Sequence, residues 1–268
     1  MVRTVFYILL LLLCTQAIYA VELDKAKKLR ESGKVDEAIA SLKESGAGDI
    51  ESQKLLAKLY LDKGMFSEAS QVYSQICSSV NTHDCYNEFG IASLSVRNYP
   101  QAISNFQKAI ELQKDSSTAH SNLAQAYYLQ NEMEKAEEAH ATALELAPFN
   151  PITRINFGVF LVKQKKFQQA KEVLYTVVGE NKTMYYAELY LGIAHYHKEE
   201  YNMALIHLNR GIAINPDYYD LYYYRALVYY KRGEYSSSLE DLKTVDKLYP
   251  TNIKTAVVRK VIKKNIKI

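Results

Sequence analysis

A small residue recurs along this chain at a nearly constant interval. Successive members are 31, 33, 34, 34, 34 and 34 positions apart, and they are Ala38, Ala69, Ala102, Ala136, Ala170, Ala204 and Ser238. A large side chain stands three positions before most of them and another stands four positions after, and these steps place the side chains on one face of a helix. A second small residue stands twelve positions before each member, and this set is Ala26, Ala57, Gly90, Ala124, Gly158, Gly192 and Ala226. Each period therefore predicts two helices joined by a turn, in an all-α chain.

Two segments, residues 121–150 and 189–218, carry this pattern almost throughout. Paired helices in 34 residues, with small residues where the helices cross, resemble the tetratricopeptide repeat. The resemblance implies a right-handed superhelical solenoid of about seven helix-turn-helix repeats over residues 21–250. Because one repeat buries too little apolar surface to be stable alone, the repeats must stack, and stacking leaves a concave face.

The helical register predicts which side chains face this concave groove. In each first helix they lie three positions before, one after and four after the small residue. Toward the C-terminal end these positions become apolar and aromatic, which favours an apolar or amphipathic segment of a partner protein as the ligand, with tyrosines as anchors. The alternative is that superhelical closure or the C-terminal helix covers this stretch. The predicted partner-binding residues are Ile155, Val159, Val162, Leu189, Ile193, Tyr196, Tyr223, Leu227 and Tyr230.

The first twenty residues have the form of a signal peptide. Arg3 precedes an apolar run at residues 5–14, which is too short to span a bilayer, and a short polar stretch ends at Ala20. We predict that residues 1–20 are a signal peptide and that the chain is periplasmic or otherwise exported. Two alternatives remain: an uncleaved membrane anchor, and lipidation of Cys14, although Leu13 is larger than the residue that usually precedes a lipidated cysteine.

Two cysteines, Cys77 and Cys85, lie beyond that segment. Cys77 falls near the end of one predicted helix and Cys85 near the start of the next, so antiparallel packing brings them together. An even pair in an exported protein favours a disulfide, and the alternative is two buried thiols that pack as small apolar groups. Two soft ligands are too few for a metal site, so none is predicted.

The charge of the chain is concentrated in its C-terminal tail. The net charge is +3, but residues 251–268 hold six basic residues and no acid, and without them and Arg3 the body has 26 basic against 30 acidic residues. Nucleic acid is therefore not an expected partner, because phosphate binding needs a basic surface along the body. The tail is predicted to be a capping helix, with Ile253, Val257 and Val261 and the adjacent Val258 and Ile262 covering the last repeat. The alternative is that this basic amphipathic helix lies on an acidic membrane surface.

Catalytic motifs are missing from the sequence. It contains no G-x-S-x-G, H-E-x-x-H, phosphate loop or dinucleotide fingerprint. His195 and His197 are two positions apart, which points their side chains in different directions on a helix. We therefore expect no enzyme activity, no cofactor and no metal ion.

Residues 154–170 and 183–196 are similar to type IV pilus pilotins, periplasmic repeat proteins that assist assembly of an outer-membrane secretin. This resemblance implies a protein-binding scaffold in the assembly of a cell-envelope complex. One alternative is a permanent structural subunit of an envelope machine. Another is a chaperone adaptor in the lumen of the endoplasmic reticulum, which glycosylation of Asn181 in the sequon 181–183 would favour.

Overall fold

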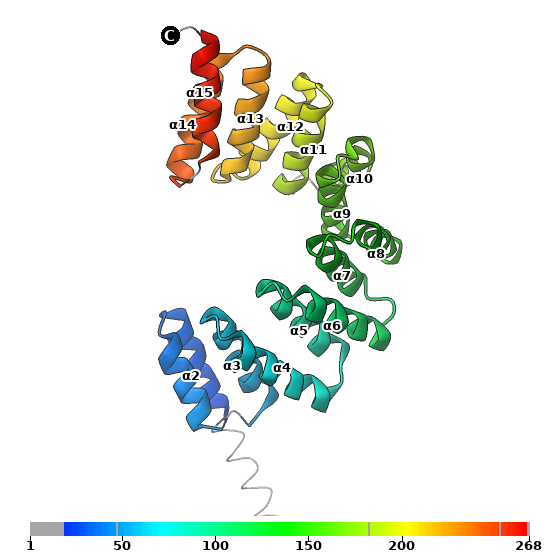
Figure 1. The fold of residues 1–268 in the computed structure, drawn as a ribbon, viewed down its shortest axis with the longest axis vertical. Coiled ribbons are helices and arrows are strands. Elements are labelled where there is room, and N and C mark those ends of the chain that lie inside the picture. The colour runs from blue at the N-terminus through cyan, green and yellow to red at the C-terminus, as the bar shows by residue number, and fades with distance from the viewer. Residues whose placement is uncertain (1–18, 47, 182, 252, 267–268) are drawn as a thin grey trace, which may run out of the picture. The chain divides into compact units, whose positions relative to one another are not determined.

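The computed structural model describes residues 19–46, 48–181, 183–251 and 253–266. Most of the predicted signal peptide, with Cys14, lies outside these ranges. The described residues form helices and no strands, as predicted, and no helix among them is long and apolar enough to cross a membrane. Residues 19–31 are helical, and the following helices are α2 (Val35–Glu44), α3 (Ile50–Asp62), α4 (Phe66–Val80), α5 (His83–Ser95), α6 (Tyr99–Leu112), α7 (Ser117–Leu129), α8 (Met133–Leu146), α9 (Pro151–Lys163), α10 (Phe167–Glu180), α11 (Tyr185–His197), α12 (Tyr201–Ile214), α13 (Tyr219–Lys231), α14 (Tyr235–Leu248) and α15 (Lys254–Ile266) (Figure 1).

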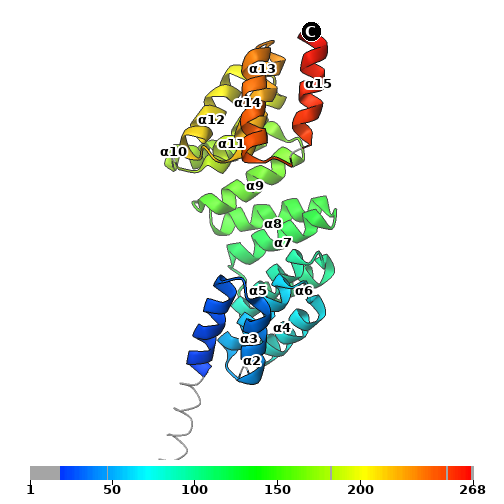
Figure 2. The same ribbon diagram turned by 90° about the vertical axis from the view of Figure 1, so that its left-hand side faces the viewer.

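The chain divides into two compact units, one up to Ala139 and one from His140. In the first unit α3 packs on α4 and α5 on α6; in the second α9 packs on α10, α11 on α12 and α13 on α14. Consecutive helices run back along each other as hairpins (Figures 1 and 2). Successive first helices of the second unit also touch, because α11 packs on both α9 and α13.

The turn inside each hairpin has the same backbone geometry seven times. One residue per turn has a positive φ, and the next residue donates its N–H to a carbonyl five positions back, as in a Schellman motif that ends a helix. After α11, for example, Glu199 has φ 61° and Glu200 N donates to His195 O at 2.9 Å. The positive-φ residues stand five positions before the recurring small residues, and they are Gly33, Gly64, Arg97, Asn131, Lys165, Glu199 and Gly233.

The two recurring sets of small residues mark the helix crossings. A Cβ atom built on Gly192 of α11 would lie 2.6 Å from Leu208 of α12, and one on Gly158 of α9 would lie 2.5 Å from Leu174 of α10. Gly90 of α5 faces Phe106 of α6 in the same way, at 2.4 Å. In these three hairpins, the large residue stands four positions after the small residue of the second helix. Its side chain fills the space that the glycine of the first helix leaves.

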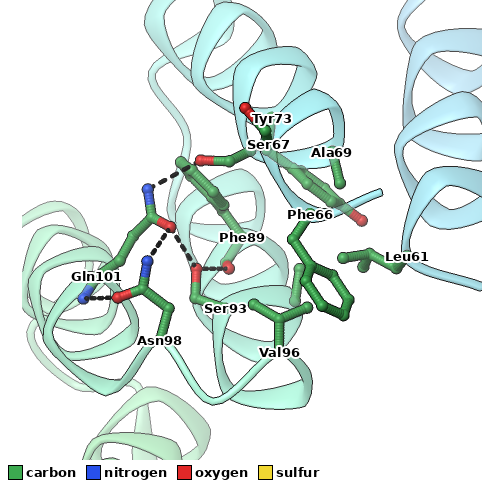
Figure 3. Close-up of a pocket in the computed structure, with 12 residues that line it drawn as sticks. Leu61, Phe66, Ser67, Ala69, Tyr73, Phe89, Ser93, Val96, Asn98 and Gln101 are labelled. Atoms are coloured by element: carbon green, nitrogen blue, oxygen red, sulfur yellow. Dashed lines mark hydrogen bonds between the residues drawn. The ribbon is translucent and has the colours of Figure 1, made fainter. Parts of the chain in front are cut away.

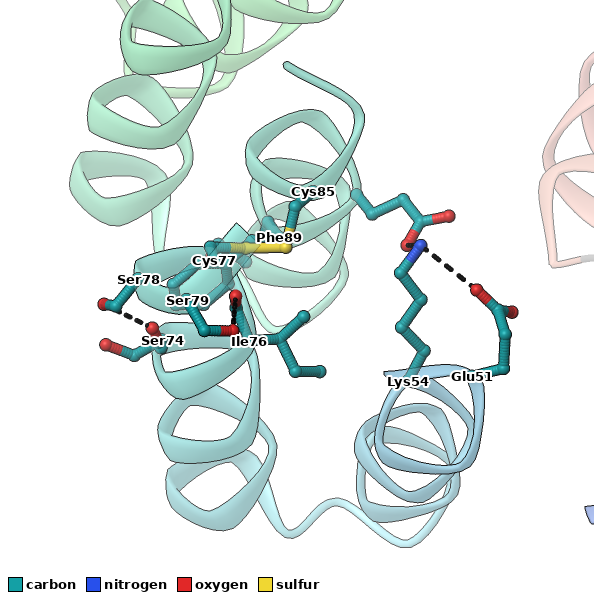
Figure 4. The surroundings of a disulfide bond; sticks show 11 residues. Glu51, Lys54, Ser74, Ile76, Cys77, Ser78, Ser79, Cys85 and Phe89 are labelled. Carbon is teal, nitrogen blue, oxygen red and sulfur yellow. Dashed lines mark hydrogen bonds and ion pairs between the residues drawn. A yellow bond between two sulfur atoms is a disulfide. The ribbon is translucent and has the colours of Figure 1, made fainter. Parts of the chain in front are cut away.

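Cys77 at the end of α4 and Cys85 in α5 form a disulfide, with Cα atoms 5.5 Å apart (Figure 4). Both are buried in a core cluster with Ala57, Tyr73 and Phe89. The ring of Tyr73 stacks on that of Phe89 at 5.4 Å. The bond therefore joins the second helix of one hairpin to the first helix of the next.

The C-terminal helix α15 packs on the last repeat with only two of the five apolar residues predicted to cover it, Val258 and Ile262. Ile262 is buried and Val258 half-buried against Ala226 and Leu242, whereas Ile253, Val257 and Val261 are exposed. Asp246 of α14 sets this rotation, because it accepts hydrogen bonds from Thr255 Oγ1 at 2.7 Å and Arg259 Nη2 at 2.6 Å. The expectation that Ile253, Val257 and Val261 cover the last repeat was wrong: both apolar stripes suit a helix, and the polar anchor to Asp246 selects one.

Gly192→Ala should destabilise the fold, and Gly179→Ala should not. The new methyl group at Gly192 meets Leu208 across the crossing and costs about 1–3 kcal/mol of unfolding free energy. Gly179 of α10 has open space at the same atom, so alanine there should stabilise the helix by up to about 1 kcal/mol. Urea unfolding followed by circular dichroism measures both, and equal midpoints for the two variants would contradict the crossing.

The disulfide should survive purification and stabilise the first unit. Mass spectrometry after alkylation without reductant should find Cys77 and Cys85 unmodified, and reduction should make both reactive. The closed loop is short, so reduction should cost about 2–3 kcal/mol. Two alkylated thiols in the unreduced protein would rule the bond out.

Candidate functional site

A pocket of about 400 Å³ opens between the start of α9 and the start of α11. Aliphatic and aromatic side chains form most of its wall, and Ile152, exposed by 63%, stands at its surface. Its lining residues are Ile152, Ile155, Asn156, Val159, Thr183, Met184, Tyr185, Tyr186 and Tyr190. The site therefore offers a mainly apolar cavity.

Local capping explains how the sequence builds the two walls. Asn150 caps α9, since its Oδ1 accepts from Ile152 N at 2.9 Å and Thr153 N at 3.2 Å, and Pro151 occupies the first turn. Ile152, Ile155 and Val159 then follow at steps of three and four along one face. Before α11, Asn181 Oδ1 accepts from Thr183 N at 3.1 Å and from Thr183 Oγ1 at 2.7 Å, a turn that leads into the tyrosine wall.

A tyrosine cluster, Tyr185, Tyr186, Tyr190 and Tyr218, continues from the pocket along the ends of the hairpins. Tyr218 packs on Tyr185 and Tyr186 with ring centroids 5.2 and 5.3 Å apart, and its hydroxyl donates to that of Tyr186 at 3.2 Å. Burial raises the pKa of Tyr218, and its bond to Tyr186 raises it further. Burial also raises the pKa of Tyr185. Tyr185 and Tyr218 therefore stay neutral at physiological pH, and the two residues add apolar ring faces with uncharged hydroxyl groups.

The predicted groove residues divide into three groups. Ile155 and Val159 line the pocket. Val162, Leu189 and Ile193 are buried, at 7%, 1% and 5% exposure, because α11 packs directly on its neighbours α9 and α13. Tyr196 and Leu227 are half-buried, and Tyr223 and Tyr230 pack on the core cluster of Ala226, Leu242 and Ile262, beside Val258 of α15.

The residues that sequence analysis missed lie at the start of the first helices. They are Ile152, Met184, Tyr185, Tyr186, Tyr190 and Tyr218. The 34-residue period contains a usable signal, because Tyr185 and Tyr219, and likewise Tyr190 and Tyr224, are one period apart. Helical register within one hairpin contains no information about side chains that meet across the connection to the next hairpin.

A buried ring cluster supports α9 within the second unit. The imidazole of His140 lies 5.7 Å from the ring of Phe157 and 5.1 Å from that of Phe160. Burial lowers the pKa of His140 to about 4, so this ring is neutral at pH 7. In most other repeats the equivalent position holds leucine or an aromatic residue.

A buried polar network supports α11. Nδ1 of His207 in α12 donates to Glu188 at 2.6 Å, and the hydroxyl of Tyr175 in α10 lies 2.7 Å from Nε2 of His195 and 3.3 Å from Nε2 of His207. His195 Nδ1 donates to Glu200, which also accepts from Lys171 Nζ at 2.9 Å. Burial lowers the pKa of His195, against the opposing effect of Glu200. The network ties α11 to both neighbours, and no grouping suited to a metal ion occurs among the residues that the structure describes.

A second pocket, of about 280 Å³, lies in the first unit between α4 and α5 (Figure 3). Phe66, Tyr73 and Phe89 line one side, and the polar side chains beside them bond one another. Gln101 Nε2 donates to Ser70 Oγ at 3.0 Å, and Asn98 Nδ2 donates to Gln101 Oε1 at 3.2 Å. These polar groups already serve to join α4 to α6, so the pocket between α9 and α11 is the stronger candidate site.

Residues 87–151 match the tetratricopeptide repeat family. The chain therefore contains tetratricopeptide repeats over these residues. Solved tetratricopeptide repeat structures share its fold: a protein from Parabacteroides merdae superposes with a TM-score of 0.69 at 12% identity, covering 92% of this chain and 99% of that one. YrrB, described as having an unusual peptide-binding site, gives 0.55 at 19% identity, covering 71% and 99%.

Two curated proteins are related in sequence to this chain. An uncharacterized protein of Haemophilus influenzae is 33% identical over 106 residues, which are 38% of this chain and 59% of that protein. Type IV pilus assembly protein PilF of Pseudomonas aeruginosa is 32% identical over 91 residues, 34% of this chain and 36% of PilF. The chain therefore matches only part of each relative, and its similarity to PilF is loose.

Acid should destabilise the second unit through His140. Its pKa is about 4 in the fold, against an ordinary value of 6.5, so stability present above pH 6.5 is lost as the pH falls toward 4. The full loss is on the order of 3 kcal/mol. Between pH 7 and about 4.5, the unfolding free energy of His140→Leu should therefore fall less than that of the parent chain. The difference between the two decreases should be on the order of 2 kcal/mol.

Urea unfolding at the two pH values measures this difference. His120→Leu is the matched control, because His120 is only half-buried and lies in the first unit. An unchanged pH dependence in His140→Leu, or an equal change in the control, would contradict the assignment.

Proposed function

We propose that this chain is an exported, non-enzymatic scaffold that binds an apolar or amphipathic segment of a partner protein at the pocket between α9 and α11. The pocket itself carries the proposal: an open, mainly apolar cavity of about 400 Å³ flanked by neutral tyrosines. Tetratricopeptide repeat proteins generally act as protein-binding scaffolds, which supports this use. No residue is assigned a catalytic role.

The chemistry of the site indicates what the partner presents. A volume of about 400 Å³ lies within the roughly 300–1,000 Å³ typical of ligand pockets, enough to enclose a few large aliphatic side chains. Ile152, Ile155 and Val159 give a wall about two turns of helix long. We therefore expect one amphipathic helix or strand that inserts apolar anchors, while tyrosine hydroxyls at the rim bond its polar groups.

The cellular setting of the proposal is assembly of a cell-envelope complex. Two observations support it: the signal-like segment at residues 1–20, and the likeness to a relative named as a type IV pilus assembly protein. The periplasm is the proposed location.

Charge placed in the pocket should abolish partner binding. Ile152→Asp with Tyr186→Asp puts carboxylates on two exposed positions, so the fold should be retained. Loss of side chains that become buried anchors in a complex typically costs about 2 kcal/mol or more of binding free energy. This cost corresponds to a Kd that is roughly 30-fold weaker. The measurement is capture from envelope extracts, followed by titration of the recovered partner against both chains.

The matched control is Met203→Asp with Ile206→Asp, which places the same charges on similarly exposed apolar positions of α12. The control should bind the partner like the parent chain. Equal recovery by the pocket variant and the parent, with helicity unchanged, would refute the proposed site. A partner that co-purifies and never exchanges would instead indicate a permanent structural subunit.

A further inference from the structure

The outward face of α15 combines aliphatic and basic side chains. Ile253, Val257 and Val261 are exposed by 83%, 65% and 41% and follow at steps of four along the chain. Lys260, Lys263 and Lys264 are exposed on the same half of the helix. In Figure 2, α15 stands to the right of α13 and α14. The outward face of α15 thus presents Val257 and Val261, with Ile253 just before the helix, next to exposed lysines.

The rotation of α15 is held by contacts on its other side. Ile262 is fully buried, and Val258 packs on the same core cluster. Thr255 and Arg259 both bond Asp246 of α14. Turning the aliphatic stripe inward would break both polar contacts and expose Ile262. The apolar residues therefore stay at the surface for as long as α15 is docked.

The charge on this face has no local compensation in sequence. Residues 251–268 contain six basic residues and no acid. The neighbouring acid, Asp246, is paired with Arg259 at 2.6 Å. The exposed lysines therefore favour binding to a negatively charged surface. Val257 and Val261 favour a surface into which small aliphatic side chains can insert.

We propose that the outward face of α15 binds a membrane surface that carries anionic headgroups. Aliphatic side chains can enter the interface while the lysine stems extend along it and keep their ammonium groups at the phosphates. An acidic protein partner fits less well, because protein interfaces centre on buried aromatic or arginine anchors, and this face offers neither. The proposal uses residues other than those of the pocket between α9 and α11, so it is independent of the proposed function.

The contact should be weak and reversible. Each lysine near an anionic bilayer strengthens binding about five-fold, so three lysines give on the order of 100-fold over a neutral surface. Three small aliphatic residues add a modest amount, far below permanent anchorage. The helix would orient the second unit on a membrane surface.

Vesicle co-sedimentation of the full chain tests the proposal. The probes are vesicles of phosphatidylcholine containing phosphatidylglycerol, and vesicles of phosphatidylcholine alone. Lys260→Glu with Lys264→Glu should weaken binding to the anionic vesicles at least about 30-fold, because two favourable charges are lost. Val257→Ser with Val261→Ser should weaken it by a smaller factor. Both changes lie on the exposed face, so circular dichroism should be unchanged.

The matched control is Lys243→Glu with Lys247→Glu, an exposed pair with the same spacing on α14. This control should keep binding to the anionic vesicles within a few-fold of the parent chain. The parent's preference for anionic vesicles should also fall in about 1 M NaCl, where screening is nearly complete. Equal binding by the parent and Lys260→Glu with Lys264→Glu would overturn the proposal. So would binding to soluble polyglutamate without binding to anionic vesicles, which would indicate an acidic protein partner.

Discussion

The close crossing of two helices at a small residue is the contact on which this structure depends. In α11 and α12 the backbone of Gly192 touches Leu208, and the same pair of positions meets again at Gly158 with Leu174 and at Gly90 with Phe106. A crossing of this kind lets a short hairpin bury a large side chain completely. It also sets the separation of the two helices, and hence the surface that each hairpin presents to the next. The same turn, with one residue at positive φ and the same backbone hydrogen bond, then returns the chain in each of these hairpins.

The candidate site follows from how successive hairpins meet. Since α11 packs on both α9 and α13, the middle of α11 is covered, and Leu189 and Ile193 there serve as core. At the starts of α9 and α11 the helices are less completely covered, and the pocket forms there. Buried clusters hold its walls from the other side: the His140 ring beside α9, and the network of Glu188, His195 and His207 beside α11. The pocket is therefore carried by rigid elements, which suits a binding surface.

Tyrosine residues show how one residue type can serve several purposes. Tyr73 is core, stacked on Phe89 and fully enclosed. Tyr175 is a polar bridge between His195 and His207. Tyr186 and Tyr218 meet through their hydroxyls next to the pocket. The composition of the chain, with 23 tyrosines and no tryptophan, did not distinguish these uses, because each depends on which neighbour arrives across a hairpin connection.

The sequence by itself determined the helices, the turns between them and the crossings, because these depend on spacings within about 34 residues. Gly192 and Leu208 could be paired from the printed letters alone. The sequence also indicated Ile155 and Val159 as surface residues of the groove, and both line the pocket. Only the tertiary structure decided that Leu189 and Ile193 are core, that Tyr186 and Tyr218 meet, and that α15 turns Val257 outward. Those outcomes depend on contacts between hairpins and on a single carboxylate, Asp246, and helical periodicity contains no information about either.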